Sequence, residues 1–119
     1  MSTIERKQTG PLMSKIVIHN GTVYLSGIVP SPDAEGKDIT TQTNSVLEQI
    51  DALLQEAGTD KSRLLTAAIW LSDIENDFST MNGIWETWLD PNGIPTRATV
   101  EAKLARPTVN VEIQVTAAL

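Results

Sequence analysis

The chain has no cysteine and a single histidine among its 119 residues. Without a thiol it can form no disulfide, no thiolate nucleophile and no Cys-ligated metal site. The one imidazole, at His19, argues against a His-based metal site and against a catalytic triad. We interpret His19 as a turn-flanking residue, because Asn20 and Gly21 follow it. Any chemistry must therefore come from other side chains.

Long hydrophobic runs and an excess of positive charge are also missing. No stretch of about 18 apolar residues could span a membrane, and residues 1–7 lack the apolar region of a secretory signal. Nine Lys and Arg stand against fifteen Asp and Glu, a net charge of −6, whereas contacts to phosphates need clustered cations. We therefore expect a cytoplasmic protein that binds neither nucleic acid nor membranes.

The remaining composition is that of an ordinary globular protein. Hydrophobic residues make up 40% and charged residues 20%, which at this length predicts one domain over residues 1–119. Residues 5–9 are polar and predict a short edge strand. Asn20-Gly21 predicts a hairpin between strands at 14–19 and 22–27, because both residues tolerate positive φ.

Two helices and a strand are predicted in the middle of the chain. Apolar residues at helical spacing run from an N-cap at Asp38 to Gly58, and Gln42 lies off this stripe. Residues 64–71 are apolar on both faces and predict a central strand. The sequence from Ser72 to Glu75 resembles a capping box, and the helix after it has a predicted buried side of Phe78, Met81, Ile84, Trp85, Trp88 and Leu89.

The last third of the chain holds two runs that alternate with period two, at 95–104 and 108–117, which predicts two half-buried strands. We expect their apolar faces to be covered and their polar faces to present Arg97 and Glu112. Arg97 is a forked, permanent cation that suits a carboxylate ligand, and Glu112 can orient or deprotonate a water. The alternative is a solvated strand face with ordinary surface charges. The predicted apolar set of the first run is Ala98, Val100, Ala102 and Leu104.

The order of these elements, β-β-α-β-α-β-β, predicts an α+β two-layer fold with two helices on one face of a single sheet. The other face then has no cover within the chain. We expect Thr66, Ala68 and Trp70 to lie there, alongside the rows of Arg97 and Glu112. A Trp exposed between small side chains indicates a partner surface, so we expect self-association through this face.

Four segments together resemble the RidA/YjgF family of small imine deaminases. They are Leu25-Ser26-Gly27, Asp77-Phe78 with Met81-Asn82, Pro95-Thr96-Arg97-Ala98-Thr99-Val100-Glu101, and Val111-Glu112-Ile113. The resemblance runs from about Gly10 to the end, and the P-x-R-x-x-V-E segment followed by V-E-I is its most specific part.

The resemblance implies a chorismate-mutase-like α+β fold, with one mixed sheet, assembled as a homotrimer whose sites lie between subunits. It implies that Arg97 holds the carboxylate of a 2-imino acid, that Glu112 handles the attacking water, and that no cofactor is needed. The implied substrate-binding residues are Ser26, Gly27, Thr99, Asn82 and Met13.

The spacing of the two site residues leaves two arrangements open. In a plain hairpin turning near Arg106, Arg97 and Glu112 would be four positions apart, roughly 13 Å at about 3.3 Å per residue, too far for one small substrate. Either the strands are not direct neighbours, or the site combines Arg97 of one chain with Glu112 of another. The chain also departs from the family at two places: Leu12-Met13 stands where many members have a tyrosine, and Ile28 follows Ser26-Gly27 in place of glutamine.

Three functions are considered on these grounds. The favoured one is a 2-iminobutanoate/2-iminopropanoate deaminase-like hydrolase, which converts reactive 2-imino or 2-enamino acids to 2-keto acids and ammonia. The second is a regulatory trimer that binds a small carboxylate at Arg97 with little catalysis, motivated by Met13. The third, a nuclease or translation inhibitor, is disfavoured by the acidic composition and the lack of a basic, aromatic patch.

Overall fold

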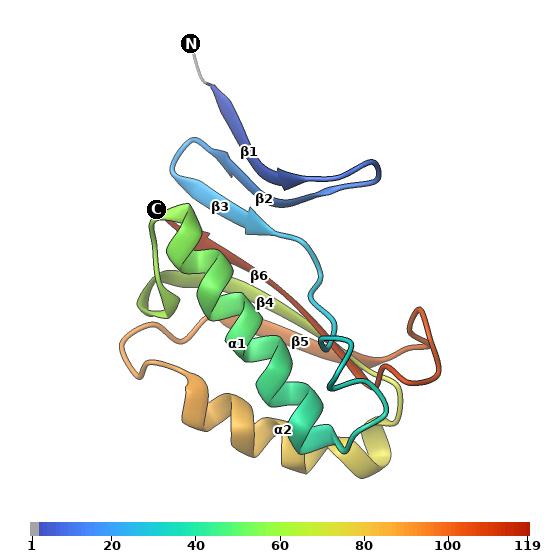
Figure 1. The fold of residues 1–119 in the computed structure, drawn as a ribbon. Coiled ribbons are helices and arrows are strands. Elements are labelled where there is room, and N and C mark those ends of the chain that lie inside the picture. Colours follow the sequence, from blue (N-terminus) through green and yellow to red (C-terminus); the bar gives the residue numbers. More distant parts are fainter. Residues whose placement is uncertain (1–2) are drawn as a thin grey trace.

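The computed structural model describes residues 3–119, which form one six-stranded sheet with two long helices on one of its faces (Figure 1). The helices are α1 (Ile39–Ala57) and α2 (Ile74–Trp88), and a short 3-10 helix, η1 (Lys61–Arg63), precedes β4. The strands are β1 (Ile4–Thr9), β2 (Ser14–His19), β3 (Thr22–Leu25), β4 (Leu64–Leu71), β5 (Thr96–Glu101) and β6 (Val111–Ala118). The predicted α+β two-layer fold is confirmed.

The sheet is mixed, with the spatial order β1-β2-β3-β6-β4-β5. Four of its strand pairs are antiparallel, and β4 pairs with β5 in parallel through the α2 crossover. The two strands of the last third are therefore not neighbours, because β4 lies between them. Of the two arrangements that the sequence left open, the structure therefore shows the first, in which the strands of Arg97 and Glu112 are not direct neighbours.

The predicted hairpin at Asn20-Gly21 and the predicted edge strand before it are both confirmed. Asn20 and Gly21 have φ values of 51° and 77°, and the register of His19 with Thr22 closes the predicted hairpin around them. The polar segment that was predicted as an edge strand is β1, which pairs only with β2.

Helix α1 begins and ends where its capping residues predicted. The carboxylate of Asp38 accepts a hydrogen bond from the Thr41 N–H at 2.9 Å, and Gly58 adopts φ 93° at the other end. One residue differs from expectation: Gln42 is fully buried rather than off the apolar stripe. Its amide bridges the backbone of Lys37 and Thr108 and the side chain of Asn110, which explains how a polar group is accommodated there.

Helix α2 differs from the prediction at its start and along its buried side. Asp73 is the N-cap and accepts from the Asn76 N–H, so the predicted capping box from Ser72 to Glu75 is wrong. A carboxylate distant in sequence, Glu101, accepts from the first helical N–H, that of Ile74, at 3.1 Å. Only two residues of the predicted buried side are buried, Met81 and Trp85.

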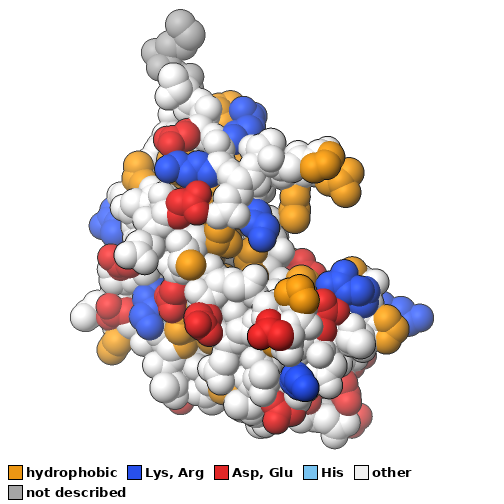
Figure 2. Space-filling model, viewed as in Figure 1, with side chains coloured by type: hydrophobic (Ala, Val, Ile, Leu, Met, Phe, Trp, Pro, Cys, Tyr) orange, Lys and Arg blue, Asp and Glu red, His pale blue; other side chains and the backbone are white. Residues whose placement is uncertain are grey.

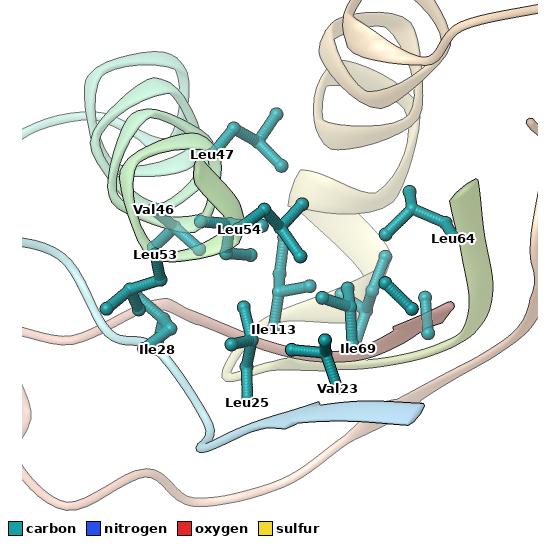
Figure 3. Packing of buried hydrophobic residues seen from close by; sticks show 14 of the residues in the cluster. Val23, Leu25, Ile28, Val46, Leu47, Leu53, Leu54, Leu64, Ile69 and Ile113 are labelled. Atoms are coloured by element: carbon teal, nitrogen blue, oxygen red, sulfur yellow. The ribbon is translucent and has the colours of Figure 1, made fainter. Parts of the chain in front are cut away.

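The core lies between the helix layer and the inner face of the sheet (Figure 3). Leu54 of α1 lies over a layer that includes Ile69 of β4 and Ile113 of β6, whereas Leu47 points sideways from α1 toward α2. Removal of these side chains from water is the main stabilising contribution to the fold. Within residues 3–119, no helix has the length and apolar character needed to cross a membrane.

The face assignment of β5 is reversed relative to the prediction. Ala98 and Val100 pair with Ala68 and Trp70 of β4, whose side chains lie on the face away from the helices. Arg97 pairs with the buried Ala67 and so lies on the helix side. The reason is that the apolar residues of β5 continue an apolar row on the uncovered face rather than contributing to the core.

Candidate functional site

The side chain of Arg97 projects from the edge strand β5 toward helix α2. Its Nη1 donates a hydrogen bond of 2.7 Å to Oδ1 of Asn82, and its Cζ lies 5.9 Å from the centre of the Phe78 ring. Both contacts are with uncharged groups. Among residues 3–119 no carboxylate forms an ion pair with Arg97. Its charge is thus held in place without being neutralised.

A cavity of about 650 Å³ opens beside this guanidinium. It is lined by Arg97 and Asn82 together with Ser79, Gly83, Trp85, Glu86, Leu89 and Ile94. We call the group formed by Arg97, Asn82, Phe78 and Thr99 the Arg97 surface. The sequence predicted Phe78 as a buried residue, but it is exposed and stacks against the cation. The sequence did carry a signal for this role of Phe78. Phe78 is one helical turn from Asn82, so the two side chains lie close together on α2.

Glu112 lies on the central strand β6 and faces the other way. It pairs with Trp70, whose side chain is on the uncovered face of the sheet. A Cβ atom placed on Gly27 would overlap the Glu112 carboxylate, so this carboxylate occupies the space that a side chain at position 27 would take. Reciprocal backbone hydrogen bonds between Ile28 and Ile113, 2.8 and 3.1 Å long, hold the two segments together.

A cavity of about 300 Å³ lies next to Gly27. Met13, Lys15, Ser26 and Gly27 line one side of it, and the rest of its wall consists of Ile28, Val29, Pro30, Ser31, Pro32, Glu35, Gln49 and Arg106. Figure 2 shows this region as a hollow between the end of the β1–β2 hairpin and the β5–β6 loop, with hydrophobic side chains at the hairpin's end. We call the group formed by Glu112, Gly27, Ser26 and Met13 the Glu112 surface.

Each of the two surfaces contains a buried hydroxyl without a partner. The Oγ of Ser26 and the Oγ1 of Thr99 are buried and make no hydrogen bond to the described residues, as is also true of Thr43 in α1. Buried hydroxyls are rarely left unpaired, so Ser26 and Thr99 keep a hydrogen-bonding capacity that the described residues do not use.

One charged pair in the smaller cavity is already satisfied. Arg106 donates two hydrogen bonds to Glu35, of 2.9 and 3.0 Å, and Thr108 donates a third. These side-chain hydrogen bonds, from Arg106 first and then Thr108, hold the pKa of Glu35 below its ordinary value. Glu35 is therefore ionised and engaged at neutral pH, and it has no free role as a base.

The two surfaces do not meet within one chain. Arg97 is level with position 67 of β4 and Glu112 with position 70, a separation of about 10 Å along the strand and about 9.6 Å across two strand spacings. Their side chains also lie on opposite faces of the sheet, which corrects the expectation that both project from the uncovered face. Thus Ser26, Gly27, Met13 and Glu112 are brought together, and Arg97, Asn82 and Thr99 form a separate group.

No metal centre is formed by the described part of the chain, because no three His, Asp or Glu side chains come together in a way that could hold an ion. The groups that could take part in chemistry are instead the Arg97 guanidinium, which forms no ion pair with the described residues, the Glu112 carboxylate beside Gly27, and the unpaired hydroxyls of Ser26 and Thr99.

Comparison with known proteins gives consistent matches over nearly the whole chain. A family model described as "Endoribonuclease L-PSP" matches residues 5–119. A RutC family protein of Haemophilus ducreyi is 44% identical, covering 89% of this chain and 88% of the relative. The RutC family protein YoaB of Escherichia coli is 42% identical, with 98% and 99% covered. A crystal structure of a YjgF family member from Neisseria meningitidis superimposes with a TM-score of 0.90 at 43% identity, over 98% of this chain and 94% of that one.

Proposed function

Since this chain belongs to the YjgF/RutC family, as the resemblance implied, we propose that it hydrolyses reactive 2-imino acids to 2-keto acids and ammonium. The observation that carries the proposal is the state of Arg97, whose cation is positioned by an amide and an aromatic ring and neutralised by neither. Such a group is ready for the carboxylate of a small ligand. Ser26, Gly27, Thr99, Asn82 and Met13 are proposed to surround that ligand.

The chemistry needs no group beyond these side chains and water. A protonated imine, R–C(=NH₂⁺)–COO⁻, is already electrophilic at its central carbon. Glu112 takes a proton from a water as the oxygen bonds to that carbon, and the same proton then passes to the nitrogen. Glu112 then takes the proton of the new hydroxyl as the C–N bond breaks and the carbonyl forms, and this proton passes to the departing ammonia, so that ammonium leaves with the 2-keto acid. Arg97 holds the substrate carboxylate throughout.

We propose that the catalytic unit is a homotrimer in which Arg97 of one copy faces Glu112 of the next. The separation of these residues and their opposite faces support this arrangement. The uncovered sheet face supports it as well, because Trp70, Ala98 and Val100 form an apolar row there, and Val100 is 49% exposed.

The test is the substitution Arg97→Ala. Imines generated by an amino-acid oxidase are captured by semicarbazide, and an active deaminase lowers the yield of semicarbazone by competing for the imine. We expect Arg97→Ala to lose about 100-fold or more in kcat/KM, since a charge-assisted, forked contact is removed. Arg97→Lys retains the charge without the fork and should recover part of the loss. Unchanged turnover by an intact Arg97→Ala oligomer would reject the proposal.

Glu112→Gln separates binding from chemistry. The amide has nearly the same shape as the carboxylate but cannot take a proton, so kcat should fall more than KM rises. Equal affinity of wild type and variant for a 2-keto acid, measured by calorimetry, would show that the pocket is intact.

A second candidate is a trimer that binds a small carboxylate at Arg97 for regulation and turns over little. Met13 favours it, because a thioether at the cavity wall offers no strong hydrogen-bond donor to the substrate. Tight binding of a 2-keto acid without any competition against semicarbazide would support this candidate. The description of the family model as an endoribonuclease does not lead us to propose RNA cleavage for this chain, since a net charge of −6 disfavours a nucleic-acid-binding surface.

A further inference from the structure

Lys15 is a charged residue of the Glu112 side that the proposed reaction does not use. It lies on β2 beside the end of β3, where its carbonyl accepts a 3.0 Å hydrogen bond from the Ser26 N–H. Its side chain is partly buried and lines the 300 Å³ cavity together with Met13 and Gly27. Within residues 3–119 its ammonium makes no hydrogen bond and no ion pair.

The other charges around this cavity do not account for Lys15. Arg106 and Glu35 neutralise one another through two hydrogen bonds. Glu112 lies against Gly27, but no ion pair joins it to Lys15. The amide of Gln49 is occupied by the Val29 carbonyl at 2.9 Å. Most of the remaining wall is apolar, formed by Ile28, Val29, Pro30 and Pro32. A cation partly withdrawn from water into such a wall lacks a counter-charge.

The direction of the substrate side chain follows from the proposed function, on which this inference rests. The central carbon of a 2-imino acid is planar and carries the carboxylate, the nitrogen and the side chain. If the carboxylate is held by Arg97 of one copy and the water by Glu112 of the next, the side chain extends away from Arg97. It then enters the cavity beside Gly27 on the copy that supplies Glu112.

We propose that Lys15 makes this protein selective for 2-imino acids with a second carboxylate at the end of a short chain. The methylene groups would pack on the apolar wall, and the terminal carboxylate would pair with the Lys15 ammonium. A simple alkyl side chain would leave that cation without a partner, so the two substrate types are distinguished by one charged contact.

The experiment compares two imines of equal chain length, 2-iminoglutarate made from L-glutamate and 2-iminopentanoate made from L-norvaline, in the semicarbazide assay. Wild type should favour the dicarboxylate, and Lys15→Met should lower its kcat/KM by about 10- to 100-fold while changing that of 2-iminopentanoate about two-fold or less. Lys15→Arg should retain most of the preference. Lys37→Met removes an exposed lysine that lines neither cavity described above, and the ratio should not change.

A binding measurement gives a readout independent of turnover. Titration calorimetry with 2-oxoglutarate and 2-oxopentanoate should show the same preference and its loss in Lys15→Met. If Lys15→Met lowers kcat for both imines equally, or leaves the ratio unchanged while Arg97→Ala still abolishes activity, the selectivity proposal is overturned and the deaminase proposal stands. If Arg97→Ala has no effect, the deaminase proposal itself fails.

Discussion

The Arg97 surface and the Glu112 surface fix their charged groups by different physical means. Arg97 stands on the edge strand β5, is exposed, and is held by one hydrogen bond and one ring. Glu112 stands on β6, between β3 and β4, is half-buried, and its carboxylate lies against the backbone of Gly27. The first arrangement leaves the cation open to a ligand beside the 650 Å³ cavity, whereas the second places a carboxylate against a backbone position that has no side chain. The proposed reaction needs both qualities, one for capture and one for positioning.

The largest effect is expected when the Arg97 surface and the Glu112 surface are inactivated on different chains, which tests whether one site combines surfaces of two copies. Arg97→Ala and Glu112→Gln are each expected to be nearly inactive. If each site takes one surface from each of two copies, trimers reassembled from an equal mixture should recover about a quarter of wild-type activity, because a quarter of the sites then combine two intact surfaces. The measurement is the semicarbazide assay after mild unfolding and refolding of the mixture.

The control for this mixing experiment is a chain that carries both substitutions, refolded with wild type in the same ratio. There the activity should be close to the statistical share of sites whose two contributing surfaces are both intact, again about a quarter. No recovery in the first mixture, together with about half of the wild-type activity in the control, would mean that the two surfaces act within one chain, because half of the chains in the control are intact.

Gly27→Ala perturbs only the Glu112 surface. The added methyl group would overlap the carboxylate of Glu112, which must move, and kcat should fall by about ten-fold or more. KM should change less, because Arg97 is untouched. Gly10→Ala serves as the matched control, since a Cβ there makes only an ordinary contact, 3.8 Å from the Met13 carbonyl oxygen, and Gly10 lines neither cavity. Equal kinetics of the two variants would show that the position of Glu112 is not critical.

Asn82→Ala perturbs only the Arg97 surface. Loss of the 2.7 Å hydrogen bond frees the guanidinium without removing its charge, so KM should rise by about three- to ten-fold with a smaller change in kcat. Combining Asn82→Ala with Arg97→Ala should add almost nothing to the effect of Arg97→Ala alone, which a double-mutant cycle measures. Additive losses would show that Asn82 acts independently of Arg97.

Gln42→Met should have the smallest effect on activity and a clear one on stability. The amide of Gln42 donates to the Lys37 and Thr108 carbonyls and to the Asn110 side chain, and its oxygen accepts from the Asn110 N–H. These contacts anchor the segment before β6, so their loss should lower the free energy of unfolding by about 2 kcal/mol, as measured in urea. Activity of the folded protein should change less than two-fold; a larger change would tie Gln42 to the position of Glu112.

The sequence predicted the elements whose signals are local. Asn20-Gly21 specifies a hairpin by backbone conformation, and Asp38 and Gly58 limit α1 through hydrogen bonds within one turn of its ends. The sequence could not predict which face of β5 meets the core. Alternating apolar and polar residues divide a strand into two faces, but they do not show which face the helices cover. Ala98 and Val100 are apolar because they continue the row of Trp70 on the uncovered face.

Only some residues of the candidate site could be predicted from the sequence. Arg97 and Glu112 could be selected by their chemistry and by resemblance, but the position of β4 between their strands is a long-range property that no local pattern carries. Lys15 was missed, because a cation at an outward-facing strand position looks the same as a solvated one. Gln42 was missed as well, since only the buried carbonyls of distant segments make its amide fit.

Placing Arg97 and Glu112 on opposite faces of one sheet has a consequence for how activity would respond to dilution. An isolated chain would carry both reactive groups and still be unable to bring them to one molecule, so separation of the copies would remove catalysis while leaving every fold intact. Specific activity would then follow the law of mass action, rising as protein accumulates and vanishing below the dissociation constant of the assembly.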